Sequence, residues 1–174
     1  MTYFELFNIP VSFLPDETYI RQQYFALSKK YHPDFAATLP IDEQVQTLEH
    51  ATLVNKAYQV LSNFERRMQY ILQEKGIIEP EGKFNLPPDF LMEMMDLNEE
   101  AMQLKMQPDS GRVGQLQQRL QQQDTALLEA IKPLLEHYNV QSATSDEYAS
   151  IKEFYYKRRY ILRLKEQINN FARS

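Results

Sequence analysis

The chain has 174 residues, of which 43% are hydrophobic and 25% charged, a composition typical of one or two globular domains. Acidic residues outnumber lysines and arginines by 24 to 19, which argues against a general nucleic-acid-binding protein. The four glycines argue against a β-sandwich or barrel, and the absence of cysteine excludes disulfides and thiolate metal sites.

The start of the chain and its hydropathy indicate where the protein works. The first residues, "MTYFELFNIP", lack the charged and apolar regions of a signal peptide. No apolar run approaches the roughly 20 residues that span a bilayer. Together with the lack of cysteine, these features predict a cytoplasmic protein with no membrane partner.

The first part of the sequence is typical of a helical hairpin. An apolar stripe predicts a helix over residues 16–31, which ends before Pro33 because the residue preceding a proline avoids the α region. The stripe of a second, longer helix contains Val45, Leu48, Ala51, Val54, Tyr58 and Leu61. We expect the two helices to pack antiparallel, with "HPDFAATLP" as an exposed loop at the tip. Residues 66–73 form a further short helix in this prediction.

A break follows the hairpin and divides the chain. Residues 74–88, "EKGIIEPEGKFNLPP", contain two of the four glycines and three of the nine prolines, which is typical of a linker. Helical patterns resume at about 88–106, 112–138 and 146–172. Thr144 and Glu147 match a capping box at the start of the last helix.

The predicted fold is therefore all-α. It has a hairpin domain over residues 1–73, a linker over 74–87 and an antiparallel three-helix bundle over 88–174.

The tripeptide His32-Pro33-Asp34 opens the predicted hairpin loop. A catalytic interpretation would pair His32 with Asp34 as base and orienting group, but no serine or cysteine nucleophile accompanies them. A metal interpretation lacks a second ligand, because the three histidines lie far apart in the sequence. The alternatives that remain are ordinary loop residues and a binding element.

The chemistry of the tripeptide suits binding. Pro33 stiffens the loop, so that little entropy is lost on docking, and the Asp34 carboxylate can accept both hydrogen bonds of an arginine on a partner. A small basic surface on the preceding helix would steer the chain toward an acidic partner, although these charges could equally be a solvated face. Its residues are Arg21, Lys29 and Lys30.

The helix at 88–106 carries more apolar residues than one core contact requires. Its core stripe contains Phe90, Met94, Leu97, Ala101 and Leu104. A second face contains Leu91, Met92 and Met95 together with Asp96 and Glu99. This second face is either a wider buried surface or a docking surface for another protein, for which adaptable methionines rimmed by acids are suitable.

The last helix shows a similar surplus. Aromatic and arginine side chains stand off its core stripe at Tyr156, Arg159 and Tyr160. Residues of these types anchor protein interfaces, although a solvated basic face is the simpler alternative.

These motifs together resemble a known family. The segments "YFELFNIP" at 3–10, "YHPD" at 31–34, "VNKAYQVL" at 54–61 and "RRMQYIL" at 66–72 are similar to a J-domain, the DnaJ-type module that stimulates ATP hydrolysis by DnaK-type chaperones. The resemblance implies that His32, Pro33 and Asp34 contact that chaperone. Phe35 departs from the family, in which a lysine or arginine often follows the tripeptide.

The whole chain resembles the HscB family of iron–sulfur cluster co-chaperones. The segments "DFLMEMMDLNEEAM" at 89–102 and "YYKRRYILRL" at 155–164 are similar to helices of that family's second domain. The resemblance implies two partners, the DnaK-type chaperone HscA and the cluster scaffold IscU, with no cofactor and no catalytic residue. Implied scaffold-binding positions are Leu91, Met92, Met95, Asp96, Glu99, Arg159 and Tyr160, of which Tyr160 replaces an expected phenylalanine.

Three alternatives remain open at this stage. The chain could be a general J-domain co-chaperone whose second domain binds unfolded polypeptides. It could be an enzyme that uses His32 and Asp34, or a purely structural helical protein.

Overall fold

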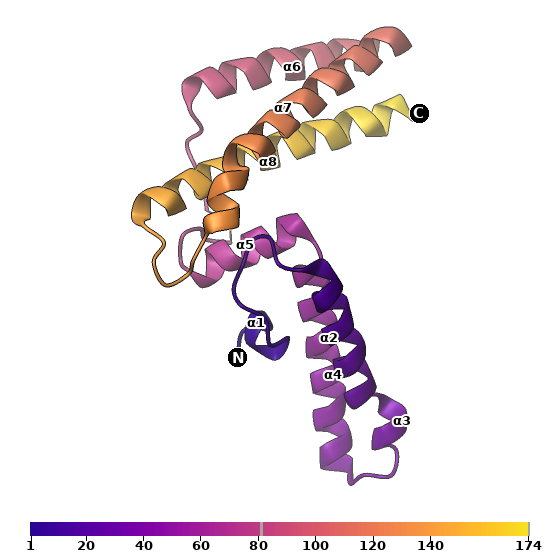
Figure 1. The fold of residues 1–174 in the computed structure, drawn as a ribbon. Coiled ribbons are helices and arrows are strands. Elements are labelled where there is room, and N and C mark those ends of the chain that lie inside the picture. The colour runs from indigo at the N-terminus through magenta and orange to yellow at the C-terminus, as the bar shows by residue number, and fades with distance from the viewer. Residues whose placement is uncertain (81, 174) are drawn as a thin grey trace. The chain divides into compact units, whose positions relative to one another are not determined.

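A computed structural model describes residues 1–80 and 82–173, and all the regular structure in these ranges is helical (Figure 1). The chain divides into two compact units. The first contains Met1–Gly76 together with Tyr138–Ser142, and the second contains Ile77–His137 and the chain from Ala143 onward. In these described ranges no helix is both long and apolar enough to cross a membrane. The prediction of an all-α fold is confirmed.

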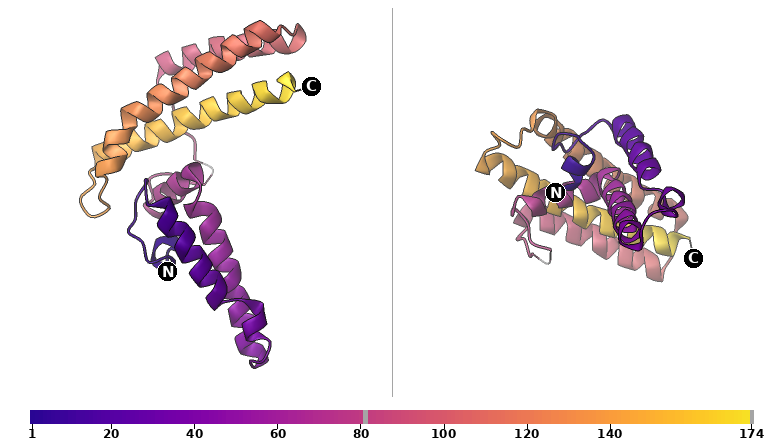
Figure 2. Two further views of the ribbon diagram at one scale, coloured as in Figure 1. Left: turned by 45° about the vertical axis from the view of Figure 1, so that its right-hand side comes forward. Right: turned by 90° about the horizontal axis from the view of Figure 1, so that it is seen from below.

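The first unit is built on a helical hairpin. Its helices are α1 (Tyr3–Leu6), α2 (Glu17–Lys30), α3 (Pro33–Ala36), α4 (Ile41–Leu61) and α5 (Phe64–Glu74). Helices α2 and α4 run side by side in all three views (Figures 1 and 2). The Asp16 carboxylate caps α2 by accepting hydrogen bonds from the backbone N–H groups of Thr18 and Tyr19, at 2.8 and 3.1 Å.

The core of this unit lies at the end of the hairpin opposite α3. Its buried side chains come from α1, α2, α4, α5 and the loop before α2, and include Phe4, Phe7, Phe13, Ile20, Val54, Ala57, Leu61, Met68, Ile71 and Leu72. Arg67 is 2% exposed among them. Its guanidinium donates hydrogen bonds to the carbonyl oxygens of Phe13 and Leu61, so it satisfies two buried backbone acceptors.

The structure corrects two expectations at the hairpin tip. The stretch after His32 is not a plain loop, because residues 33–36 form the single turn α3 and bury Ala36. Val45 and Leu48 were expected in the core stripe of α4, but both are exposed. The reason is that α2 ends opposite the middle of α4, since Tyr31 stacks on His50, and beyond that point the single turn α3 is too short to cover both side chains.

The second unit is the predicted three-helix bundle. It contains α6 (Pro88–Met106), α7 (Ser110–His137) and α8 (Ser145–Ala172), and each helix packs on the other two. Its main core cluster consists of Phe90, Met94, Leu97, Ala101, Leu104, Val113, Leu116, Leu120, Ile161, Leu164 and Ile168. The predicted capping box is confirmed, since Thr144 and Glu147 each accept a hydrogen bond from the other's backbone N–H.

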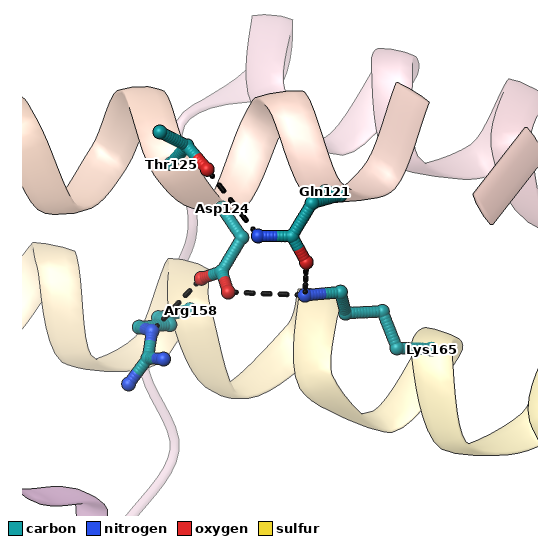
Figure 3. A network of polar contacts seen from close by, with 5 residues as sticks. All are labelled: Gln121, Asp124, Thr125, Arg158 and Lys165. Carbon is teal, nitrogen blue, oxygen red and sulfur yellow. Dashed lines mark hydrogen bonds and ion pairs between the residues drawn. The ribbon is translucent and has the colours of Figure 1, made fainter. Parts of the chain in front are cut away.

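A buried acid fixes α7 against α8. Asp124 is 4% exposed, and its carboxylate accepts hydrogen bonds from Arg158 Nε at 2.8 Å and Lys165 Nζ at 3.1 Å (Figure 3). Burial raises the pKa of Asp124, but the hydrogen bonds and positive charges of Arg158 and Lys165 outweigh burial and leave this pKa below its ordinary value.

Residues 82–86, within the expected linker, pack against the second unit. The Phe84 ring stacks on Tyr156 with centroids 4.9 Å apart, and Leu86 packs on the core cluster. Helix α5 ends at Glu74, and the two units divide after Gly76. The boundaries of 1–73, 74–87 and 88–174 stay predictions.

Candidate interaction sites

The His32-Pro33-Asp34 tripeptide is the start of helix α3. The imidazole of His32 is its N-cap, with Nδ1 accepting the backbone N–H of Asp34 at 3.2 Å. Pro33 occupies the first helical position, where its missing N–H costs nothing. The three residues are therefore held in a defined turn rather than in a loose loop.

The Asp34 carboxylate points away from the protein. Its side chain is 87% exposed, and its Oδ2 lies 3.6 Å from Nδ1 of His32. Phe35 follows it and is also exposed, with its ring at 72° to that of His32 and the two centroids 6.1 Å apart. An exposed, acceptor-only carboxylate beside an exposed aromatic ring is well suited to an arginine on another protein.

The three predicted basic residues of α2 do not form one patch. Lys29 and Lys30 are exposed in the last turn of α2, next to His32. Arg21 is also exposed, but it precedes Lys29 by eight residues, or roughly 12 Å along the helix axis. The two lysines are thus placed to act with the tripeptide, whereas Arg21 lies in the N-terminal half of α2, toward the opposite end of the hairpin.

A second feature at the tip is an apolar groove of about 290 Å³ between α3 and α4. Its lining residues are Pro33, Ala36, Ile41, Gln44, Val45, Thr47 and Leu48. Sequence reasoning missed this groove, because it assigned Val45 and Leu48 to the core.

The second face of α6 is largely exposed. Met92 and Met95 are 66% and 64% exposed, Asp96 and Glu99 are exposed, and Leu91 is half-buried. The alternative of a wider buried surface is therefore wrong for the two methionines. Sequence reasoning missed two further members of this stripe, Met102 and Met106, which are also exposed. Met102 lies seven residues after Met95 and Met106 four residues after Met102, and this spacing was the available signal.

The two predicted α8 residues lie where α8 meets α6. The Tyr160 ring packs edge-to-face on Phe90 of α6, with centroids 6.3 Å apart, so it contacts the core rather than standing clear of it. Arg159 is half-buried, and its guanidinium lies 5.9 Å from the centre of the Tyr155 ring. Tyr160 therefore lies against the first turn of α6, at the residue that precedes Leu91 in the chain.

His50 and His137 each make local contacts of their own. His50 stacks on Tyr31 and contacts the carbonyl of Gln46, and His137 contacts the carbonyl of Pro133. No group of three or more histidine, aspartate or glutamate side chains that could hold a metal ion occurs within residues 1–80 and 82–173.

Comparison with known proteins assigns both halves of the chain. The DnaJ domain family matches residues 2–70, and the HSCB C-terminal oligomerisation domain family matches residues 86–169. A co-chaperone protein HscB homolog from Psychromonas ingrahamii is 32% identical over 153 residues, covering 87% of this chain and 89% of the relative. The chain belongs to the HscB family of co-chaperones.

Other HscB proteins agree with this assignment. A homolog from Vibrio cholerae serotype O1 (strain M66-2) is 40% identical over 101 residues, a match that spans 58% of this chain and 59% of the relative. The structure of chaperone HscB from Vibrio cholerae aligns with a TM-score of 0.75 and 27% identity over 99% of this chain and 98% of that one. Human co-chaperone HscB aligns with a TM-score of 0.80 and 26% identity, covering 98% and 81% of the two chains.

Proposed function

We propose that this HscB-family protein stimulates the ATPase of a DnaK-type chaperone, HscA, and delivers the iron–sulfur cluster scaffold IscU to it. The observation that carries the proposal is the exposed His32-Pro33-Asp34 turn at the tip of a DnaJ-domain hairpin. The Asp34 carboxylate would pair with an arginine of the chaperone, and Lys29 and Lys30 would steer the approach of an acidic surface. His32 would hold the turn and Arg21 would contribute at longer range.

The second unit would bind the scaffold. Exposed Met92 and Met95, half-buried Leu91 and the acids Asp96 and Glu99 supply an adaptable apolar surface with a polar rim. Arg159 and Tyr160 on α8 would extend this surface.

We further propose that the protein functions in the cytoplasm and has no active site of its own.

The test is steady-state ATP hydrolysis by HscA, measured with this protein and IscU added separately and together. The expected result is stimulation by this protein alone that rises further when the scaffold is present. No stimulation under either condition would contradict the proposal.

One other function has an observation in its favour. The exposed methionines of α6 could accept many unfolded chains, as expected of a general co-chaperone. A competition experiment separates the two functions, because displacement of IscU by an unrelated unfolded peptide at similar concentration would favour the general role. Retention of IscU would favour the dedicated one.

A further inference from the structure

The second unit contains a groove on the side of α8 that carries Arg159. It has a volume of about 480 Å³ and lies between α8 and the segment before α6. The lining residues that matter here are Lys83, Phe84, Tyr156, Arg159, Tyr160 and Arg163. Among these described lining residues three are cationic and none is acidic, although the protein as a whole carries a net charge of −5.

The cations of this groove lack the carboxylate partners that three cations of α8 have among the described residues. Arg158 and Lys165 face Asp124 on α7, and Lys157 pairs with Glu153 at 3.7 Å. Within the described part of the chain, no carboxylate forms an ion pair with Arg159, Arg163 or Lys83. The two arginines are four residues apart, so they lie on one face of α8 about one turn from each other.

Aromatic rings form the rest of the wall. Phe84 stacks on Tyr156 at an interplanar angle of 9°, and the Tyr156 hydroxyl donates a hydrogen bond of 3.5 Å to the Gly82 carbonyl. Burial raises the pKa of Tyr156, and the positive charge of Arg159 opposes that increase. Glu79 also acts on Tyr156 but does not line the groove. Arginine side chains can pair with a carboxylate, and aromatic rings next to them can contact the apolar or aromatic part of the same ligand.

We propose that this groove binds an acidic segment of the scaffold protein, with one carboxylate held between Arg159 and Arg163 and a second near Lys83. The inference rests on the proposed function, because Arg159 and Tyr160 belong both to the groove and to the proposed scaffold surface. It extends that surface to Arg163, Lys83 and Phe84.

Charge distribution supports an acidic occupant. The α6 part of the scaffold surface exposes Asp96 and Glu99, which repel acids, whereas the charged side chains described in the groove lining are all cationic. A scaffold segment with its acidic residues over the groove can bind in one orientation only, because reversing it would place like charges together. The groove would therefore set the register of the scaffold, while the α6 methionines supply apolar contact.

The test compares Arg163→Glu and Lys83→Glu with the wild-type protein in calorimetric titrations of IscU at two salt concentrations. We expect each substitution to raise Kd by at least about tenfold, because each places a carboxylate against an acidic segment. The wild-type Kd should rise with salt, and that of Arg163→Glu should change less. Lys132→Glu on α7 is the matched control, since Lys132 is exposed, pairs only with Glu136 among the described residues, and does not line the groove.

Two results separate this inference from the proposed function. Wild-type binding of IscU that is lost by Leu91→Ala/Met95→Ala but unchanged by Arg163→Glu and Lys83→Glu would overturn the groove inference alone. A second measurement uses no scaffold: NMR titration with a blocked Glu-Tyr-Glu peptide should shift the amide signals of residues 82–86 and the side-chain signals of Arg159 and Arg163. Shifts of equal size in Arg163→Glu would also overturn the inference.

Discussion

The ring nitrogen Nδ1 of His32 accepts the backbone N–H of Asp34 across 3.2 Å. This bond requires a free lone pair on Nδ1, so the neutral ring carries its proton on Nε2 and offers that N–H as its single donor to a partner. His32 thus orders the turn, while Asp34 keeps its own carboxylate exposed. The two residues therefore have different tasks, and their substitutions should have different effects.

Replacing Asp34 by asparagine should abolish stimulation of the chaperone ATPase and leave the fold intact. The side chain is exposed and its carboxylate makes no hydrogen bond within the described residues, so stability should change by less than about 0.5 kcal/mol. Loss of one partner of a desolvated charge pair should reduce stimulation by at least about tenfold. ATPase rates and circular dichroism measure the two effects.

The matched control for Asp34→Asn is Glu49→Gln, which removes an exposed acid from α4 outside the tripeptide. It should stimulate the ATPase as the wild type does. Normal stimulation by Asp34→Asn would show that the tripeptide is not the chaperone contact.

Replacing both Leu91 and Met95 by alanine should weaken IscU binding without affecting stimulation by the first unit alone. Met95 is exposed and Leu91 is half-buried, so most of the lost free energy should come from the interface rather than from the core. We expect roughly 2–3 kcal/mol, or on the order of a hundredfold in Kd, measured by calorimetry. Unchanged affinity would remove α6 from the scaffold surface.

Methionine oxidation provides a direct measurement of the α6 face. Hydrogen peroxide should convert Met92, Met95, Met102 and Met106 to sulfoxides well before the buried Met68 and Met94, because oxidation follows exposure. Peptide mass spectrometry over time measures the order. Met94 is the internal control, since it adjoins Met95 in the chain but is fully buried, and equal oxidation rates for the pair would contradict the assigned faces.

Replacing Asp124 by asparagine should destabilise the second unit by about 1–3 kcal/mol, because Arg158 and Lys165 would lose a buried carboxylate partner. The folded-state pKa of Asp124 is lowered, so its contribution is fully present above the unfolded pKa of about 3.9 and is lost as the pH falls through the lower folded value. Urea unfolding between about pH 2 and pH 7 measures the free energy of unfolding of both proteins.

The variant Asp124→Asn should therefore differ from the wild type at pH 7 and converge toward it in acid. Glu129→Gln, an exposed acid on the same helix, should match the wild type throughout. A gap between wild type and Asp124→Asn that stays constant down to about pH 2 would show that the carboxylate charge does not matter.

Much of this protein follows from local sequence alone. Helical periodicity, the Asp16 cap, the Thr144–Glu147 capping box and the core stripe of α6 all depend on residues within a few positions of one another. Short-range interactions of this kind can be read without knowing which segments meet. The His32-Pro33-Asp34 motif and the excess of methionines on α6 were visible for the same reason.

Only the tertiary structure decided which faces have neighbours. Val45 and Leu48 have the spacing of core residues, yet they stay exposed because this end of α4 extends past the end of α2. The groove beside Arg163 requires residues 82–86 to fold back on α8, and Phe84 meets Tyr156 across 72 positions of sequence. Burial depends on segments distant in the chain, so periodicity defines a face but does not determine what covers it.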